Sequence, residues 1–309
     1  MANRPRWFKA RSAYSAVQRT VDRQFLFKPD ETTRNIIGSA AGRALEKFPV
    51  KIYWLDFNIN HKHSSFAPLS DSPEHIQNLV KFQQMFNSLV ARGLNKHFGR
   101  EGALYSTRNR ITEVVDDASL EQQLIYAVTN PVKDGLVERA AHWKGFSSYK
   151  QLATGEVERF QYVDWATWYR EGKRKKKPPQ AFVKIVEVKL TPIPSWEGMS
   201  EDKRQARFRR LIREDEQRCK EGLEGEGRGV MGPMKLAKLD HRERPKSPAK
   251  RTPQPLCHSS TAEGAKKYEK TWRAFLDQYY SASKMWLKGE YGVEFPLGSF
   301  KPPLIRVNK

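Results

Sequence analysis

The sequence predicts an α+β protein in which helices cover an antiparallel sheet. Strand-like and helix-like patterns alternate as strand, helix, strand, strand, helix, strand, helix within about 130 residues. This order favours a ferredoxin-like sheet with its helices on one face. We expect residues 1–165 to form one domain, followed by a basic linker at 166–180 and a C-terminal extension at 181–309.

Helix caps and turn residues set the borders of the expected elements. Ser72 before Pro73 is a good helix start, because serine caps free N–H groups and proline suits the first turn. Ser119 begins a capping box for a later helix. That helix should end near Asn130, because Pro131 disfavours helical backbone in the residue before it. The expected elements are strands at 12–27 (with a turn near Asp22), 50–57, 61–67 and 103–115, and helices at 30–46, 73–98 and 119–130.

The C-terminal extension differs in composition from the first half. It follows a basic run that ends in prolines, GKRKKKPP at 172–179. One strand is expected at 181–190, then a highly charged helix at 200–222 and an aromatic-rich helix at 262–288. The Gly, Pro, Lys and Arg content of residues 222–258 predicts a partly disordered segment. The aromatic side chains of the last helix have two interpretations: they stack on unpaired bases, or they pack a small core of the extension.

The charge balance indicates the class of partner. Lys and Arg outnumber Asp and Glu by 56 to 35, which gives a formal net charge of +21. Such an excess points to a polyanion, most often nucleic acid. A membrane is less favoured, because no apolar stretch approaches the ~20 residues needed to cross a bilayer. Two cysteines without a CxxC pair argue against a disulfide framework and a cysteine-built zinc site.

Two histidines lie one residue apart in the stretch NINHKHSSF, at residues 58–66. Alternate side chains of a strand share a face, so His61 and His63 should point one way and Lys62 the other. Two imidazoles on one face can chelate a divalent cation, and the cation can polarise a phosphoryl oxygen. The other interpretation is a solvated strand end.

A polar face on the helix at 119–130 carries a tyrosine. Gln122, Tyr126 and Asn130 are four residues apart and therefore share this face, while the apolar residues form another stripe. A phenol near a bound cation becomes more acidic and can attack phosphorus, and Asn130 can supply a neutral oxygen to the same ion. The alternative is that Tyr126 is an interfacial aromatic residue and Asn130 ends a helix before proline.

Several stretches occur in a specific order and spacing over residues 12–150. They are RTVDRQFLF at 19–27, NHKH at 60–63, Gly99 to Arg110, YAVTNPVKDGLV at 126–137, and His142-Trp143 with SSY at 147–149. Together they resemble the REP-associated tyrosine transposases, the single-tyrosine branch of the HUH endonucleases. The segment at 126–137 is similar to the tyrosine helix of that family and to the turn that follows it.

The resemblance implies a transposase, a metal-dependent endonuclease and strand transferase that acts on single-stranded DNA. His61, His63 and Asn130 would hold Mg²⁺ or Mn²⁺, and Tyr126 would form a 5′-phosphotyrosine and release a 3′-OH. DNA hairpins beside the cleavage site are the implied partner, and a cytoplasmic, nucleoid-associated protein of bacterial type is the implied setting. The candidates for contacts with the DNA backbone are Arg19, Arg23, Arg108, Arg110, Lys173, Arg174 and Lys175.

Lys62 departs from the family pattern, in which the residue between the histidines is bulky and apolar. An unpaired ammonium buried there costs several kcal/mol or loses its proton. Three solutions are open: snorkelling at the sheet edge, pairing with Asp56 or Glu74, or loss of the catalytic constraint. The last corresponds to a catalytically weak or inactive DNA-hairpin-binding protein on the same fold. An RNA- or ribosome-associated protein would explain the charge but not the tyrosine segment.

Overall fold

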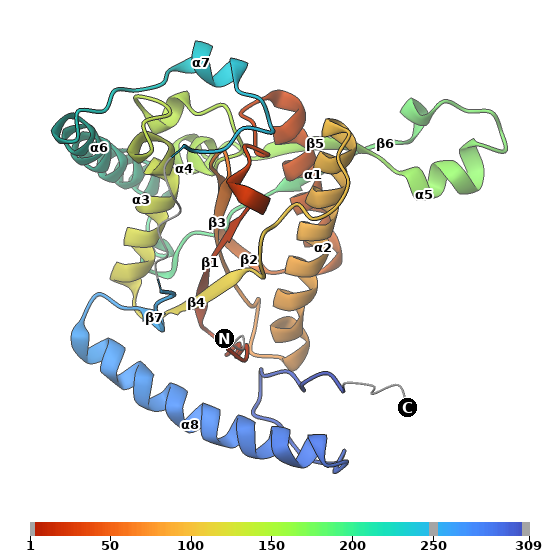
Figure 1. Cartoon of the computed structure of the whole chain (residues 1–309), viewed down its shortest axis with the longest axis vertical. Helices are drawn as coiled ribbons and strands as arrows, with labels where there is room; N and C mark the ends of the chain where they lie inside the picture. The colour runs from red at the N-terminus through yellow and green to blue at the C-terminus, as the bar shows by residue number, and fades with distance from the viewer. Residues whose placement is uncertain (1–3, 247–252, 305–309) are drawn as a thin grey trace.

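A five-stranded sheet forms the centre of the molecule (Figure 1). The computed structural model describes residues 4–246 and 253–304. Four strands pair in antiparallel fashion, and the fifth, β7, pairs in parallel with β4. The sheet is therefore mixed, where the sequence predicted an antiparallel one. In spatial order the strands are β2 (Lys51–Phe57), β3 (His61–Ala67), β1 (Ala13–Arg19), β4 (Arg110–Val114) and β7 (Cys257–His258).

Helices cover both faces of this sheet, which corrects the expectation that they lie on one face. α1 (Glu31–Lys47) and α2 (Pro73–Phe98) pack on one side, and α3 (Asp117–Lys133) packs with α6 (Glu201–Gly225) on the other (Figure 1). The reason lies in strands such as β2, which is buried on both faces from Ile52 to its end. Such a strand needs a cover on each side.

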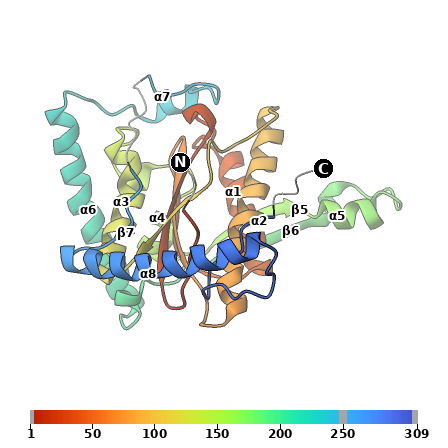
Figure 2. The same ribbon diagram turned by 60° about the horizontal axis from the view of Figure 1, so that its bottom comes forward.

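The remaining elements extend this core. α8 runs across one end of the sheet, from β7 towards α2 (Figures 1 and 2). A second sheet, the hairpin β5–β6, continues into an arm that projects from the molecule. These elements are α4 (Tyr149–Thr154), β5 (Glu158–Val163), α5 (Trp165–Thr167), β6 (Val183–Val188), α7 (Pro233–Lys238) and α8 (Ala262–Leu287), with short turns η1 (Val21–Arg23), η2 (Ala140–His142), η3 (Trp168–Gly172), η4 (Pro179–Phe182) and η5 (Pro194–Trp196).

The borders of the N-terminal elements agree with the sequence prediction except at β1, α3 and β4. β1 ends at Arg19, and residues 21–27 contain the turn η1 and no strand, where a strand at 12–27 was expected. The Asp116 side chain caps α3 by accepting from the Ser119 N–H, so Ser119 lies inside the first turn. α3 also continues through Pro131 to Lys133, because burial of Pro131 and Val132 against neighbouring elements outweighs the local preference. β4 begins only at Arg110, and the preceding chain is a loop in which Tyr105 forms an isolated bridge with Thr20, just after β1.

The C-terminal half shares the cores of the N-terminal half. Val186 and Val188 of β6 join the core under α1, where Gly38 and Gly42 permit close approach of the hairpin. Phe208 of α6 joins the core under α3. The domain borders at 165 and 181 stay a prediction, although side chains from both sides of these borders pack together.

The expected disorder at 222–258 is not confirmed for the described part of that segment. α7 forms there, Leu223 and Leu236 are buried, and β7 pairs with β4. Residues 247–252 lie outside the described residues. Within residues 4–246 and 253–304, no helix is both long enough and apolar enough to cross a membrane.

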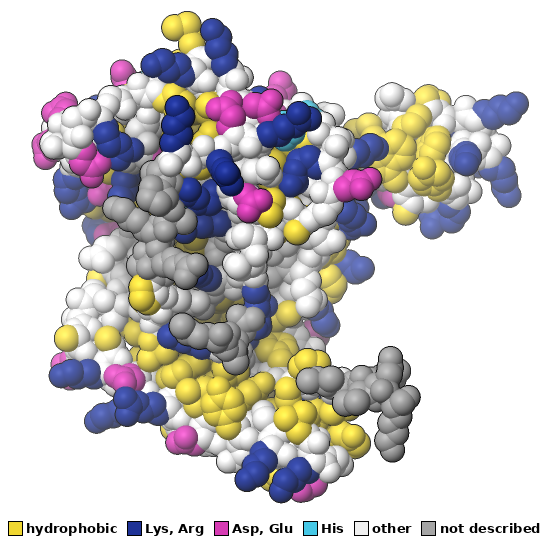
Figure 3. All heavy atoms as spheres, in the orientation of Figure 1, with side chains coloured by type: hydrophobic (Ala, Val, Ile, Leu, Met, Phe, Trp, Pro, Cys, Tyr) yellow, Lys and Arg dark blue, Asp and Glu magenta, His cyan; other side chains and the backbone are white. Residues whose placement is uncertain are grey.

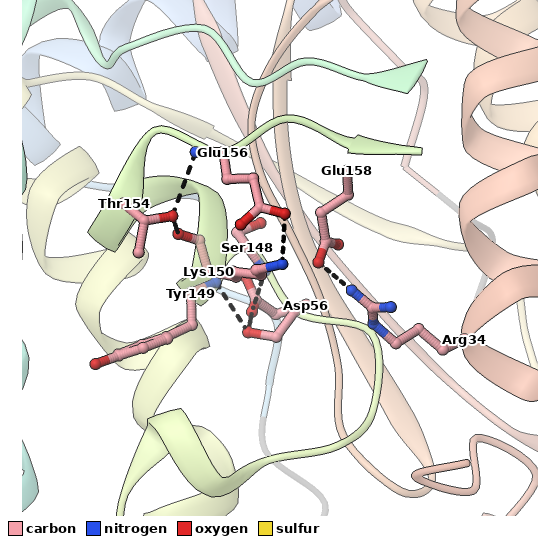
Figure 4. Close-up of polar contacts among 9 residues, drawn as sticks. Arg34, Asp56, Ser148, Tyr149, Lys150, Thr154, Glu156 and Glu158 are labelled. Carbon is pink, nitrogen blue, oxygen red and sulfur yellow. Dashed lines mark hydrogen bonds and ion pairs between the residues drawn. The ribbon is translucent and has the colours of Figure 1, made fainter. Parts of the chain in front are cut away.

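The SSY segment closes the outer edge of β2 (Figure 4). The Ser148 hydroxyl accepts from the Leu55 N–H and donates to the Leu55 carbonyl, at 2.7 and 3.1 Å. Ser147 Oγ donates to the Asp56 carboxylate at 2.5 Å, and Trp143 Nε1 donates to the Phe57 carbonyl at 2.9 Å. These bonds give partners to polar groups on the edge strand β2, which leads into the turn before His61. This piece of the motif therefore has a structural role.

Candidate nucleic-acid cleft and metal site

A cleft of about 790 Å³ opens beside β1, β3, β4 and α3. β3 contributes both histidines, α3 contributes Tyr126, and a returning C-terminal segment contributes a further wall. The side chains that line it include Arg19, Arg23, His61, His63, Arg110, Gln123, Tyr126, Arg244, Gln254 and His258. The cleft thus joins residues that are more than 240 positions apart in the chain, from Ser15 to His258.

The histidine pair lies as strand alternation predicts. The imidazole rings of His61 and His63 face the cleft with their centroids 5.0 Å apart and an angle of 80° between their planes. Burial is the largest cause that lowers the pKa of both rings, so the neutral form that binds metals is favoured. His63 Nε2 is buried and has no hydrogen-bond partner within the described residues.

Tyr126 stands beside His63 at the mouth of the cleft. The two ring centroids are 5.4 Å apart, and the rings meet edge-on at 85°. Tyr126 is 37% exposed, so a ligand in the cleft can reach its phenol. The ammonium of Lys133 lies 4.6 Å from the tyrosine ring centroid. Lys133 and Arg19 also contribute positive charge near His63.

Asn130 is held in place by a network of amides. Its Oδ1 accepts a hydrogen bond from Asn58 Nδ2 at 2.5 Å, and Asn58 also donates to the Asp134 carboxylate at 2.6 Å. The Asp134 carboxylate only accepts hydrogen bonds, so the Asn58 atom next to it must be the donor Nδ2. The same Nδ2 also contacts Asn130, so the Asn130 atom in that contact must be the acceptor Oδ1. His61 Nε2 lies 2.9 Å from that same oxygen.

His61 therefore has an oxygen next to each ring nitrogen. Nδ1 is 2.8 Å from Asn60 Oδ1, and Nε2 is 2.9 Å from Asn130 Oδ1. A neutral imidazole has one N–H, so one of these contacts brings two lone pairs together. A divalent cation between Nε2 and Asn130 Oδ1 would relieve it. Neighbouring ligands at about 2.1 Å from an octahedral Mg²⁺ are about 3 Å apart, close to the observed spacing.

The donor set suits a cation bound through nitrogen and a neutral oxygen. His61, His63 and Asn130 supply it, and Asn58 and Asp134 form the supporting shell. Within the part of the chain that the structure describes, no three His, Cys, Asp or Glu side chains are grouped to hold a metal. The candidate site therefore depends on the amide of Asn130.

The cationic candidates divide into three groups. Arg19, Arg23 and Arg110 line the cleft together with His61, His63 and Tyr126. Arg108 instead lies near Arg6 and α8, and burial lowers its pKa. The run Lys173, Arg174 and Lys175 lies on the projecting arm, away from the cleft (Figure 1).

Several residues of the candidate site lie outside the set that the sequence predicted. Asp134 continues the spacing of four from Tyr126 and Asn130 and was detectable by that rule. Asn58, Arg244 and His258 carried no comparable signal, because only folding brings them to the site. Cys257 and His258 form β7, which pairs with β4, and His258 also lines the cleft.

Lys62 points away from the cleft and is fully buried. Its ammonium donates to Asn87 Oδ1 and lies 4.7 Å from the ring centroid of Phe86 and 5.4 Å from that of Tyr105. Burial lowers its pKa to about 7. Snorkelling and a partner such as Asp56 are therefore both incorrect, because α2 supplies an amide and aromatic faces instead.

Glu74, the other expected partner, lies in the first turn of α2 and is exposed. Lys62 thus lies among aromatic rings and one amide on the α2 side of the sheet and does not enter the candidate metal site.

The fold and the cleft define an α+β protein with a cationic cleft that is lined by a histidine pair and a tyrosine, with the buried Asn130 amide in contact with His61. No family model and no curated protein matches the chain. A solved structure of a REP-associated tyrosine transposase bound to a REP hairpin is similar over 58% of this chain and 90% of that chain, with 16% identity and a TM-score of 0.37. At that level of similarity, the function must be argued from the residues of this chain.

Proposed function

We propose that the protein is a metal-dependent endonuclease and strand transferase for hairpin-flanked single-stranded DNA. The observation that carries this proposal is the position of His61 between two oxygen acceptors, beside an exposed Tyr126. The element order β1-α1-β2-β3-α2-β4 is that of the ferredoxin-like unit. A DNA substrate implies a cytoplasmic, nucleoid-associated protein.

In this proposal His61, His63 and Asn130 hold Mg²⁺ or Mn²⁺. The chemistry that a bound divalent cation supplies is polarisation of the scissile phosphate. Asn58 orients the Asn130 amide through its hydrogen bond, and Asp134 holds Asn58. Arg19, Arg23 and Arg110 line the same cleft and bind the flanking phosphates.

Tyr126 is the nucleophile. Its Oη forms a bond to phosphorus as the bond between phosphorus and the 3′ oxygen breaks, which leaves a 5′-phosphotyrosine and a free 3′-OH. The phenol gives up one proton and the 3′ oxygen gains one. The phosphodiester energy is kept in the covalent intermediate, so a 3′-OH can reverse the step without ATP.

A covalent adduct tests the proposal. The protein is incubated with a labelled single-stranded oligonucleotide that carries a hairpin, with Mn²⁺ or with a chelator, and resolved under denaturing conditions. We expect an adduct with Mn²⁺ that is lost in Tyr126→Phe and kept in Tyr280→Phe, which alters an exposed tyrosine on α8. Binding without an adduct, across several hairpins and with both metals, would sink the assignment of an enzyme.

A catalytically weak or inactive hairpin-binding protein is the second candidate. The positive charges of Arg19 and Lys133 near the histidines favour it, because they oppose the binding of a cation. This protein would bind the same hairpins with no adduct and no dependence on Mn²⁺. The adduct experiment therefore separates the two candidates directly.

A further inference from the structure

The arm at residues 164–184 carries an exposed aromatic cluster and a dense basic turn. It projects from the β5–β6 hairpin, and Figure 3 shows a hydrophobic patch on it with Lys and Arg side chains around the rim. This range contains seven Lys or Arg residues and only two carboxylates. Both carboxylates pair within the arm, Asp164 with Lys184 and Glu171 with Arg170.

The basic turn at residues 173–177 concentrates positive charge. Lys173, Arg174, Lys175, Lys176 and Lys177 are consecutive and all exposed. Within residues 4–246 and 253–304, no ion pair to a carboxylate is found for these five side chains. Like charges this close repel one another, and a polyanion relieves the repulsion.

A small core fixes the geometry of this turn. Trp168 Nε1 donates to the Lys177 carbonyl at 2.8 Å, and the Lys177 N–H donates to the Gly172 carbonyl at 2.9 Å. A side chain at position 172 would collide with Trp168 and Phe182, so glycine permits this close packing. These contacts hold the two ends of the basic turn together.

Aromatic rings stand next to the basic turn. Tyr169 is 61% exposed and Trp165 is 43% exposed, with their ring centroids 6.4 Å apart. The Lys173 ammonium lies 5.7 Å from the Tyr169 ring centroid. Exposed aromatic faces beside a cationic track are the two features by which proteins bind unpaired nucleotides: bases stack on the rings and phosphates follow the charges.

We propose that this arm is a second nucleic-acid site, separate from the cleft, that binds unpaired nucleotides by stacking on Tyr169 and Trp165 while the 173–177 turn contacts phosphates. This inference rests on the proposed function for its substrate, a DNA strand with unpaired regions. The arm adds an anchor outside the cleavage cleft, so affinity and strand choice depend on residues that take no part in cleavage.

Equilibrium binding of a labelled, unstructured oligothymidine tests the arm. All proteins carry Tyr126→Phe so that no covalent bond forms. We expect Tyr169→Ala to weaken binding about tenfold with an unchanged salt dependence, and Tyr169→Phe to bind like the parent. A triple change of Lys173, Lys175 and Lys177 to Gln should lower the slope of log K against log salt by about 2, at about 0.7 per charge.

Matched controls come from α8. Tyr280→Ala removes a tyrosine that is 57% exposed, and the triple change of Lys266, Lys267 and Lys270 to Gln removes three exposed charges. Neither should change the affinity by more than about twofold, apart from a weak long-range effect of charge. Circular dichroism and thermal unfolding of each variant check that the fold is kept.

Three outcomes would overturn the arm proposal. Equal binding by the arm variants and the α8 variants would exclude a site on the arm, and an equal loss of affinity from Tyr169→Ala on a blunt duplex with the same number of phosphates would exclude base stacking. Tighter binding to anionic phosphatidylserine vesicles than to the oligonucleotide would indicate a membrane surface. Adduct formation, measured separately with Tyr126 intact, distinguishes failure of this arm from failure of the cleavage proposal.

Discussion

His63 meets the ring of Tyr126 edge-on, with 5.4 Å between the ring centroids and 85° between the planes. One residue is a buried strand histidine with an unsatisfied Nε2, and the other is a helix tyrosine open to the cleft. Under the proposed function, this contact would place the metal-ligating imidazole of His63 next to the nucleophile Tyr126.

Removal of the amide support should weaken metal binding. We expect Asn130→Ala to lower Mn²⁺ affinity strongly and Asn58→Ala to lower it about 10- to 100-fold, because Asn58 orients the Asn130 oxygen. Asn130→Asp should raise the affinity, since a carboxylate replaces a neutral oxygen. Isothermal titration calorimetry with Mn²⁺ measures these changes without DNA. His258→Ala, on another wall of the cleft, is the control; equal losses in all variants would contradict the assignment.

Replacement of Lys62 should stabilise the protein. We expect Lys62→Met to raise the free energy of unfolding by about 1–4 kcal/mol, because a buried ammonium is exchanged for an apolar chain among aromatic rings. Asn87→Leu alone should cost about 1–3 kcal/mol, since it leaves the ammonium without its amide acceptor.

When Lys62 is already Met, Asn87→Leu should carry no such cost. Urea unfolding of the parent protein, the two single variants and the double variant measures this double-mutant cycle. An equal cost of Asn87→Leu with Lys62 and with Met at position 62 would refute the coupling. Mn²⁺ affinity should stay constant throughout, because Lys62 lies on the opposite face of the sheet from the cleft.

Stability should fall as the pH rises from about 4 to 6 because of Asp56. Burial raises the pKa of Asp56 from 3.8 to about 6, so in this window the folded state keeps a proton that the unfolded state releases. The free energy of unfolding then decreases with pH, by up to about 3 kcal/mol. Asp56→Asn should flatten this part of the profile in urea titrations. The exposed Asp277→Asn should leave it unchanged, and identical slopes in both variants would argue against a buried acid.

Arg19 and Arg108, both candidates for DNA contacts in the sequence, should behave differently towards DNA. Arg19→Gln should reduce the salt slope of hairpin binding by about 0.7–0.9, because Arg19 lines the cleft. Arg108→Gln should leave the slope unchanged, since Arg108 lies beside α8. Fluorescence anisotropy over a range of salt concentrations measures both, and a larger effect at Arg108 would show that the DNA follows another path.

Local sequence rules predicted much of the candidate site. Alternation placed His61 and His63 on one face of β3 and Lys62 on the other, and β3 has the predicted borders. Helical spacing placed Tyr126 and Asn130 together. The same rule failed at Pro131, where tertiary packing carried α3 one turn further and brought Asp134 into the amide network.

By itself the sequence determined which side chains share a face, because the periods of strands and helices are properties of the local backbone. Only the tertiary structure decided what those faces meet. It set α3 against β3 so that Tyr126 meets His63, placed Asn87 over Lys62, and returned Arg244 and His258 to the cleft. These contacts join distant positions, and their geometry follows from packing two cores on opposite sides of one sheet.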